Sequence, residues 1–167
     1  NDIITLDLER TKAEGLLADP WQTDTSIGPW GYDTQKPYRP VKSMIHELVD
    51  IVSKNGNMLL NVPPKADGSL DEETEDILKQ IGQWLDLNGE AIYGSRPWHV
   101  YGEGDLRFTQ KGNRLYAIAL SWTNREQSIT LASLEDVVTD VTLLGHNEPL
   151  QWDCLLYTSD AADDRSW

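Results

Sequence analysis

The sequence has little cysteine, phenylalanine or positive charge, and it has no long apolar run. Its single cysteine, Cys154, excludes an internal disulfide bond and a zinc site built from cysteines. Acidic residues outnumber basic residues by 28 to 14, and the net charge of -14 argues against nucleic acid or an anionic membrane as a partner. No stretch approaches the ~20 apolar residues of a membrane-spanning helix, so we expect no membrane insertion.

Several catalytic motifs are also absent. The three histidines, His46, His99 and His146, lie far apart and do not form an HExxH pattern, so we predict no metal site. The sequence has neither a GxSxG elbow nor a phosphate-binding loop, which argues against a serine triad and nucleotide binding. Carboxylates remain, and paired carboxylates are the groups that glycoside cleavage requires. Seven Trp and six Tyr against one Phe slightly favour a carbohydrate site, because flat rings with polar edges suit sugar faces.

The first half of the chain has the pattern of an α/β repeat. We predict a short strand around residues 3–8, then a long loop over residues 21–40 that is rich in Gly, Pro, Thr and Asp. Apolar residues spaced as in a helix run from Val41 to Val52, and an apolar strand buried on both faces follows at 57–62. A second amphipathic helix is expected to begin at a capping box formed by Ser69 and Glu72 and to end near Asn88. Gly56 is the expected left-handed residue after the first helix.

After Trp98 the pattern changes to short strands separated by turns. We predict strands at HVYG, LRFTQ, RLYAIALSW, SITLAS and VTDVTLLG, with Lys111–Asn113 as a hairpin turn. This spacing favours an antiparallel β-sandwich, so the predicted fold class is α/β plus all-β, with domains at 1–97 and 98–153. We interpret residues 154–167, which contain CLLYTSDAADD, as a non-native tail derived from a sequencing adapter, and we exclude them from the fold.

Three positions in loops or at strand ends are candidates for a site. Glu9 follows a strand and precedes a loop, where a catalytic acid could lie, although a solvated turn residue has the same pattern. Trp30, between Pro29 and Gly31, packs either on a sugar face or on a neighbouring loop. Asn61 ends a strand and either binds ligand or fastens a turn.

Three segments together resemble the alpha-L-fucosidases of glycoside hydrolase family 29: WQTDTSIGPWGY, SKNGNMLLNVPPKADGSL and NGEAIYGSRPW. The resemblance covers residues 6–153. It implies the last repeats of a (β/α)8 barrel, followed by a small antiparallel β-sandwich. The implied reaction is retaining hydrolysis of terminal alpha-linked L-fucose from a fucosylated glycan, without a metal or an organic cofactor.

The resemblance also assigns residues. Glu9 matches the acid/base carboxylate, with Asp7 as the runner-up, and the aspartate nucleophile is expected on an earlier strand outside this sequence. Trp30 matches an aromatic position near the fucose methyl group. Trp21 is the second substrate-binding candidate, although its place in the sequence favours packing beneath the loop. Gln22 stands where many members have Glu, so the role of that carboxylate is not carried over.

These inferences lead us to expect the C-terminal part of a larger glycosidase, which is inactive by itself. The alternative is a carbohydrate-binding or structural β-sandwich attached to an inactive fucosidase-like remnant. If the aromatic side chains of the sandwich are exposed, they favour carbohydrate binding, and if they are buried, they favour a structural role. The side chains that distinguish these two roles are Tyr101, Phe108, Tyr116 and Trp122. The acidic balance and the lack of a native cysteine are compatible with a periplasmic or extracellular enzyme, whose signal peptide would lie upstream.

Overall fold

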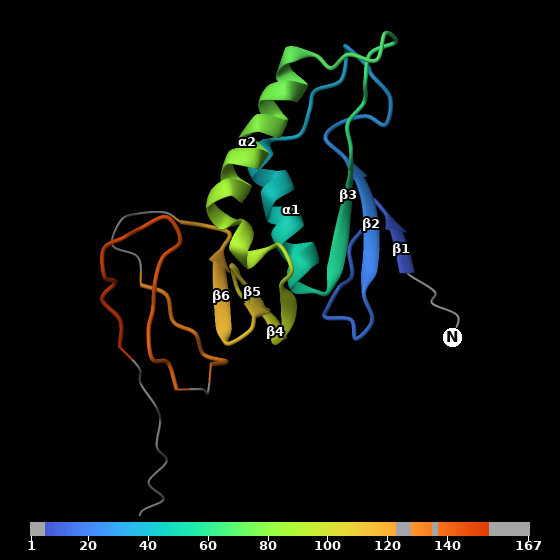
Figure 1. Cartoon of the computed structure of the whole chain (residues 1–167). Coiled ribbons are helices and arrows are strands. Elements are labelled where there is room, and N and C mark those ends of the chain that lie inside the picture. Colours follow the sequence, from blue (N-terminus) through green and yellow to red (C-terminus); the bar gives the residue numbers. More distant parts are fainter. Residues whose placement is uncertain (1–5, 123–127, 135–136, 154–167) are drawn as a thin grey trace, which may run out of the picture.

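Two three-stranded sheets, two α-helices and a short 3-10 helix (Gly89–Ala91) form the computed structural model, which describes residues 6–122, 128–134 and 137–153 (Figure 1). The first sheet is parallel, in the order β1 (Leu6–Glu9), β2 (Trp21–Ser26) and β3 (Gly56–Asn61). Helix α1 (Val41–Ser53) connects β2 to β3. A parallel pair needs such a crossover, so this part of the chain forms a βαβ unit.

Strand β2 lies where the sequence predicted a loop, and that prediction is wrong for its first residues. Trp21, Thr23 and Thr25 are buried on the side of the sheet that faces α1, and the residues between them are less buried. Threonine is β-branched and fits the pleated surface of a strand. Buried and less buried residues therefore alternate along β2, as expected for a strand. Two of the three buried side chains are polar, so the sequence shows no apolar alternation.

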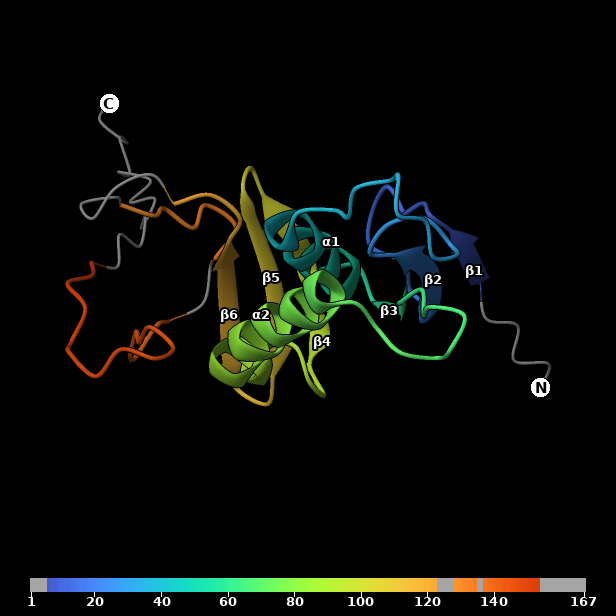
Figure 2. The ribbon, with the colours of Figure 1, turned by 90° about the horizontal axis from the view of Figure 1, so that it is seen from above.

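Helix α1 lies between the two sheets, because it contacts β3 on one side and β4 and β5 on the other (Figure 2). It ends near Asn55, which has a φ of 71° and is therefore the left-handed residue expected at Gly56. Gly56 is needed for a different reason. A Cβ atom at this position would lie 2.5 Å from Cε2 of the Trp21 ring.

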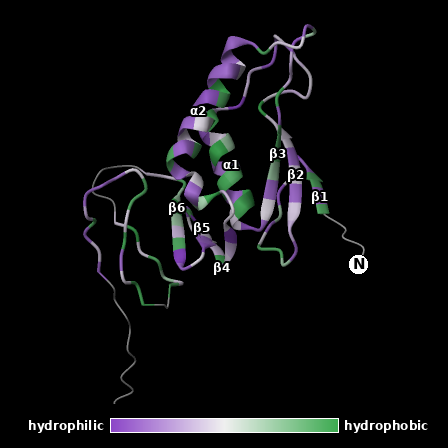
Figure 3. Ribbon diagram, in the orientation of Figure 1, coloured by the Kyte–Doolittle hydropathy of each residue, from purple (hydrophilic) through white to green (hydrophobic). Residues whose placement is uncertain are grey.

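Helix α2 (Glu72–Asn88) packs beside α1 through Ile77 and Ile81. Its cap is Asp71, whose Oδ1 accepts a hydrogen bond from the backbone N–H of Thr74 at 2.8 Å, and not the predicted Ser69. Figure 3 shows that α1 is mainly hydrophobic and α2 largely hydrophilic, in agreement with the central position of α1. Among the described residues, both helices lack the combined length and apolarity of a transmembrane segment.

The second sheet is antiparallel, in the order β4 (Arg96–Glu103), β5 (Leu106–Lys111) and β6 (Arg114–Ala119). The predicted turn at residues 111–113 joins β5 to β6. The buried ring of Phe108 meets the edge of Trp98, with ring centroids 5.3 Å apart. These three strands confirm the sequence prediction for residues 99–120 in its outline.

The expected sandwich is not seen in the described part of the chain, which has a single antiparallel sheet. The predicted strands SITLAS and VTDVTLLG lie in segments 128–134 and 137–153, where the described residues form neither helix nor strand. Backbone N–H groups of Ala132 and Ser133 donate to the Glu103 carboxylate instead of to a neighbouring strand. Val137 and Leu143 remain exposed, so no second apolar layer forms there. The predicted tail at 154–167 lies outside the described residues.

Candidate active site

The parallel sheet has one face that the described residues leave uncovered. Leu8 and Met58 pack with Trp21 on the α1 side, and successive side chains of a strand alternate between faces. Adjacent positions on the strands therefore point to the opposite side. The rows of this open face are Asp7, Gln22 and Asn57, then Glu9, Asp24 and Leu59, and finally Ser26 and Asn61. Leu59 is 56% exposed, so the first two rows are open to solvent, whereas Ser26 in the last row is buried beneath the loop that follows β2.

Glu9 is the last residue of β1 and lies at the carboxyl edge of this open face. It is exposed, and its register partner on β2 is Asp24. The next residue, Arg10, has a φ of 52° and donates its backbone N–H to the Asp24 carbonyl oxygen at 2.8 Å, which turns the chain away from the sheet. Asp7 lies on the same face, one row further from the edge. The carboxyl ends of parallel strands are where α/β folds place catalytic groups.

The loop after β2 presents Trp30 at the same edge. Asn61, at the end of β3, donates from Nδ2 to Ser26 Oγ and to the Trp30 carbonyl oxygen, both at 3.0 Å. A Cβ atom on Gly28 would lie 2.8 Å from the Tyr38 ring, so only glycine allows the loop to pack so closely there. Asn61 thus fastens the loop, as one of its two predicted roles required, and the Trp30 ring remains 40% exposed.

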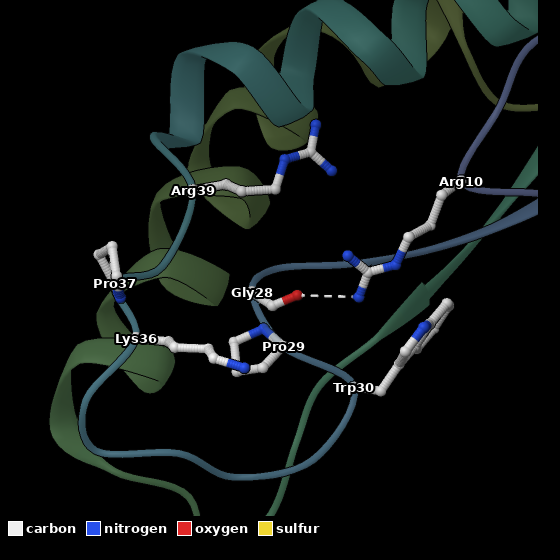
Figure 4. Close-up of a pocket in the computed structure, with 7 residues that line it drawn as sticks. All are labelled: Arg10, Gly28, Pro29, Trp30, Lys36, Pro37 and Arg39. Atoms are coloured by element: carbon white, nitrogen blue, oxygen red, sulfur yellow. Dashed lines mark hydrogen bonds between the residues drawn. The ribbon is translucent and has the colours of Figure 1, made fainter.

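Arg10 connects the Glu9 edge to the Trp30 loop. Its guanidinium carbon lies 4.3 Å from the centroid of the Trp30 ring, and its Nη2 donates to the Gly28 carbonyl oxygen at 3.1 Å (Figure 4). These residues border a pocket of about 600 Å³. Its lining consists of Arg10, Gly28, Pro29, Trp30, Lys36, Pro37 and Arg39.

Trp21 does not belong to this site, which corrects its prediction as a substrate-binding residue. Its side chain is 0% exposed and packs against Ile51 in the core. The indole Nε1 donates to the Lys54 carbonyl oxygen at the end of α1, at 2.8 Å. A fully buried ring cannot contact a ligand, so Trp21 attaches β2 to α1, in line with its alternative reading.

The sequence interpretation did not single out the basic residues of the pocket. Arg39 Nη1 donates to Thr25 Oγ1 at 3.0 Å, and its Nη2 pairs with Glu47. A sequence signal did exist, because Lys36 and Arg39 closely follow Trp30 in a chain with only 14 basic residues. Within the described ranges, no group of three or more His, Cys, Asp or Glu residues is arranged to hold a metal ion.

Comparison with known proteins gives matches along most of the chain. The family described as alpha-L-fucosidase matches residues 4–90, and the alpha-L-fucosidase C-terminal domain matches residues 102–160. The tissue alpha-L-fucosidase of Bos taurus is 36% identical over 150 residues, which cover 86% of this chain and 32% of that protein. The plasma alpha-L-fucosidase of Homo sapiens is 34% identical over 149 residues, covering 82% of this chain and 32% of that protein.

Solved structures agree with these matches. The alpha-fucosidase of Thermotoga maritima in complex with fucose has a TM-score of 0.58 at 38% identity, covering 64% of this chain and 26% of that chain. Isoenzyme 1 of Paenibacillus thiaminolyticus alpha-L-fucosidase has a TM-score of 0.61 at 34% identity, covering 65% of this chain and 28% of that chain. The chain spans about a third of the length of the curated relatives it matches. From the family match over residues 4–90 and the relatives that carry the same name, the chain belongs to the alpha-L-fucosidase family.

Proposed function

We propose that the protein containing this chain removes terminal alpha-linked L-fucose from glycans, with Glu9 as its general acid/base. The observation that carries the proposal is the position of Glu9 at the carboxyl end of β1, on an open polar sheet face. Trp30 lies at the same edge, and Arg10, the residue after Glu9, contacts its ring. A carboxylate beside an exposed aromatic ring suits a sugar bond that needs both a proton donor and a surface to pack against.

The three parallel strands are proposed to be the last strands of a (β/α)8 barrel. The helical crossover through α1 and the uncovered polar face both support this, because a barrel buries its inner strand faces and carries its helices outside. The chain spans about a third of the length of its relatives, which leaves room for the other strands elsewhere in the protein. The nucleophile, an aspartate, is proposed to lie on one of those strands, so this chain alone should not hydrolyse fucosides.

The proposed reaction retains the configuration at the sugar carbon. Glu9 protonates the leaving oxygen while the aspartate attacks, and the two carboxyl groups of a retaining enzyme stand roughly 5 Å apart. Glu9 then removes a proton from the water that releases fucose. Trp30 would pack near the sugar methyl group, a contact that distinguishes a 6-deoxy sugar from a hydroxylated one by about 1–3 kcal/mol.

The part of the chain at 98–153 is proposed to be a domain that supports the catalytic part at 1–97. Phe108 and Tyr116 are buried, and the Tyr101 ring is covered by the cationic groups of Lys54 and Arg107. The alternative function, carbohydrate binding by this domain, is favoured by the exposed ring of Trp122, which is the one exposed member of the four deciding aromatics. Under that alternative, Trp122→Ala would abolish glycan binding without changing turnover of a small fucoside.

The test of the proposed function uses the full-length protein and an aryl alpha-L-fucoside. Glu9→Ala should lower turnover by about 10²–10⁴-fold, and added azide should restore part of it, because azide can attack the glycosyl-enzyme in place of water and needs no base to remove a proton. Asp7→Ala is the matched control, one row further from the edge of the same face. Turnover unchanged by Glu9→Ala, or azide rescue confined to Asp7→Ala, would remove Glu9 from the role. Release of fucose with inverted configuration would exclude the retaining mechanism.

A further inference from the structure

The pocket beside Trp30 concentrates positive charge in an acidic chain. Three of its seven lining residues are basic and none is acidic, although the chain has 28 acidic and 14 basic residues. Figure 4 shows the Arg10 guanidinium directed towards Gly28, the Arg39 guanidinium directed towards helix α1, and the Lys36 amine near Pro29. This local charge is opposite in sign to that of the chain as a whole.

The three cations differ in how their charges are matched. Arg39 pairs with Glu47 and donates to β2, so it forms a fixed wall of the pocket. Arg10 makes no ion pair with any described residue and uses only Nη2 in its hydrogen bond to Gly28. The Lys36 side chain is 66% exposed, and its ion pair with Asp33 at 3.6 Å is of the surface kind that contributes little. Two cations are therefore available to a ligand.

On the basis of the proposed function, we propose that this pocket binds an anionic group, a sulfate ester or a carboxylate, carried by the saccharide from which fucose is removed. A guanidinium donates parallel N–H groups to such an anion, and a lysine adds charge. Arg10 directly follows Glu9 and lies on the Trp30 ring, so an anion held there is adjacent to the proposed sugar site. One face of the Trp30 ring is taken by Arg10, which leaves the rest of the ring for the sugar.

The overall charge gives such a pocket a selective effect. The part of the protein formed by this chain has a net charge of -14 and repels anionic saccharides, so a local positive site would favour their binding at this edge of the sheet. Because Lys36 is solvent-exposed, its contribution should be screened by salt.

The test measures kcat/KM of the full-length protein on matched fucosyl disaccharides. One is neutral, one carries a sulfate ester on the sugar next to fucose, and one has a uronic acid there. The wild-type protein should prefer an anionic substrate, and this preference should fall as salt rises. Lys36→Gln should reduce the preference about threefold, and Arg10→Gln about tenfold. Lys79→Gln removes an exposed lysine on α2, outside the pocket lining, and should leave the preference unchanged.

The outcomes separate the anion site from the proposed function. Equal kcat/KM on neutral and anionic substrates, or an equal loss on both in Lys36→Gln and Arg10→Gln, would overturn the anion site. Preference for only one anionic substrate would support the site and identify the group. Failure to hydrolyse any substrate would reject the proposed function. In that case, calorimetric binding of the sulfated and neutral disaccharides to the Glu9→Ala protein still decides: tighter binding of the sulfated form supports the site, and equal or no binding rejects it.

Discussion

Arg107 on β5 donates from Nε to Oδ1 of Asp50 on α1, with a distance of 2.6 Å between the two atoms. The other oxygen of Asp50 lies 2.9 Å from the Lys54 amine and 3.0 Å from the Lys12 amine. The Asp50 side chain is only 5% exposed. One buried carboxylate therefore joins the antiparallel sheet, helix α1 and the loop between β1 and β2, on opposite sides of the predicted domain boundary.

We predict that Asp50→Asn strongly destabilises the protein. The change leaves the Lys54 amine buried without a counter-charge, and breaking a buried pair from one side costs about 3–5 kcal/mol. Lys12→Gln is the control, because the Lys12 side chain is substantially exposed and its loss should cost about 1 kcal/mol or less. Urea unfolding of the full-length variants measures both values. If Asp50→Asn has the same unfolding free energy as the wild type, the ion pairs of Asp50 with Lys12, Lys54 and Arg107 do not stabilise the fold.

The same carboxylate should make stability depend on pH at the acidic end. Burial of Asp50 opposes its ionisation, but hydrogen bonds from Arg107, Lys54 and Lys12 outweigh burial and lower the pKa from 3.8 to about 2. A lowered pKa in the folded state gives stability that is complete above about pH 3.8 and is lost as the pH falls through about 2. The shift corresponds to about 2 kcal/mol. The difference in unfolding free energy between wild type and Asp50→Asn should therefore narrow from about pH 5 to about pH 2, and a constant difference would contradict the shift.

Two glycines should respond to alanine in opposite directions. A Cβ atom at Gly56 would lie 2.5 Å from the Trp21 ring and 2.7 Å from Ile51 Cγ2, so Gly56→Ala should cost about 1–3 kcal/mol by overpacking. Gly82 lies inside α2 with nothing near its missing Cβ, so Gly82→Ala should stabilise the helix by about 0.5–1 kcal/mol. Thermal unfolding compares the two variants. A neutral Gly56→Ala would mean that the Trp21 ring moves freely, against its complete burial.

The two helices and strand β3 could be predicted from the sequence, because their apolar residues already indicate a buried face. The stripe from Val41 gives α1, and the apolar run ending at Asn61 gives β3. Strand β2 could not be recognised in the same way, because Thr23 and Thr25 are buried there in place of aliphatic residues. The segment SITLAS was misleading in the opposite direction, since it alternates like a strand while its backbone bonds to a side chain.

The candidate site was predictable only in part, for a similar reason. Glu9 could be proposed because it follows a strand within the sequence itself. The contact between Arg10 and Trp30 depends on how two loops meet, and no local pattern encodes such a meeting. Trp21 and Trp30 are the same residue type and lie close together in the sequence, but Trp21 is buried against α1 and Trp30 is exposed.

Asn61 hydrogen-bonds the loop that carries Trp30, so we predict that it affects catalysis without contacting the reacting atoms. Asn61→Ala removes two hydrogen bonds, to Ser26 and to the Trp30 carbonyl oxygen, each contributing about 1 kcal/mol to the position of the loop. Under the proposed function, we expect kcat/KM on an aryl alpha-L-fucoside to fall about tenfold, mainly through a higher KM, because a displaced Trp30 weakens sugar binding before and during the reaction alike.

The matched control for this prediction is Asn57→Ala, on the same face of β3 but at its other end, where Nδ2 donates to the Trp21 carbonyl oxygen at 3.4 Å. This variant loses a hydrogen bond of the same type without touching the Trp30 loop, so its kcat/KM should remain within about twofold of the wild type. Unfolding measurements on both variants separate a shifted loop from a weakened fold. Equal losses of kcat/KM in the two variants would assign the effect to the strand as a whole, whereas a loss confined to Asn61→Ala would locate it in the loop that carries Trp30.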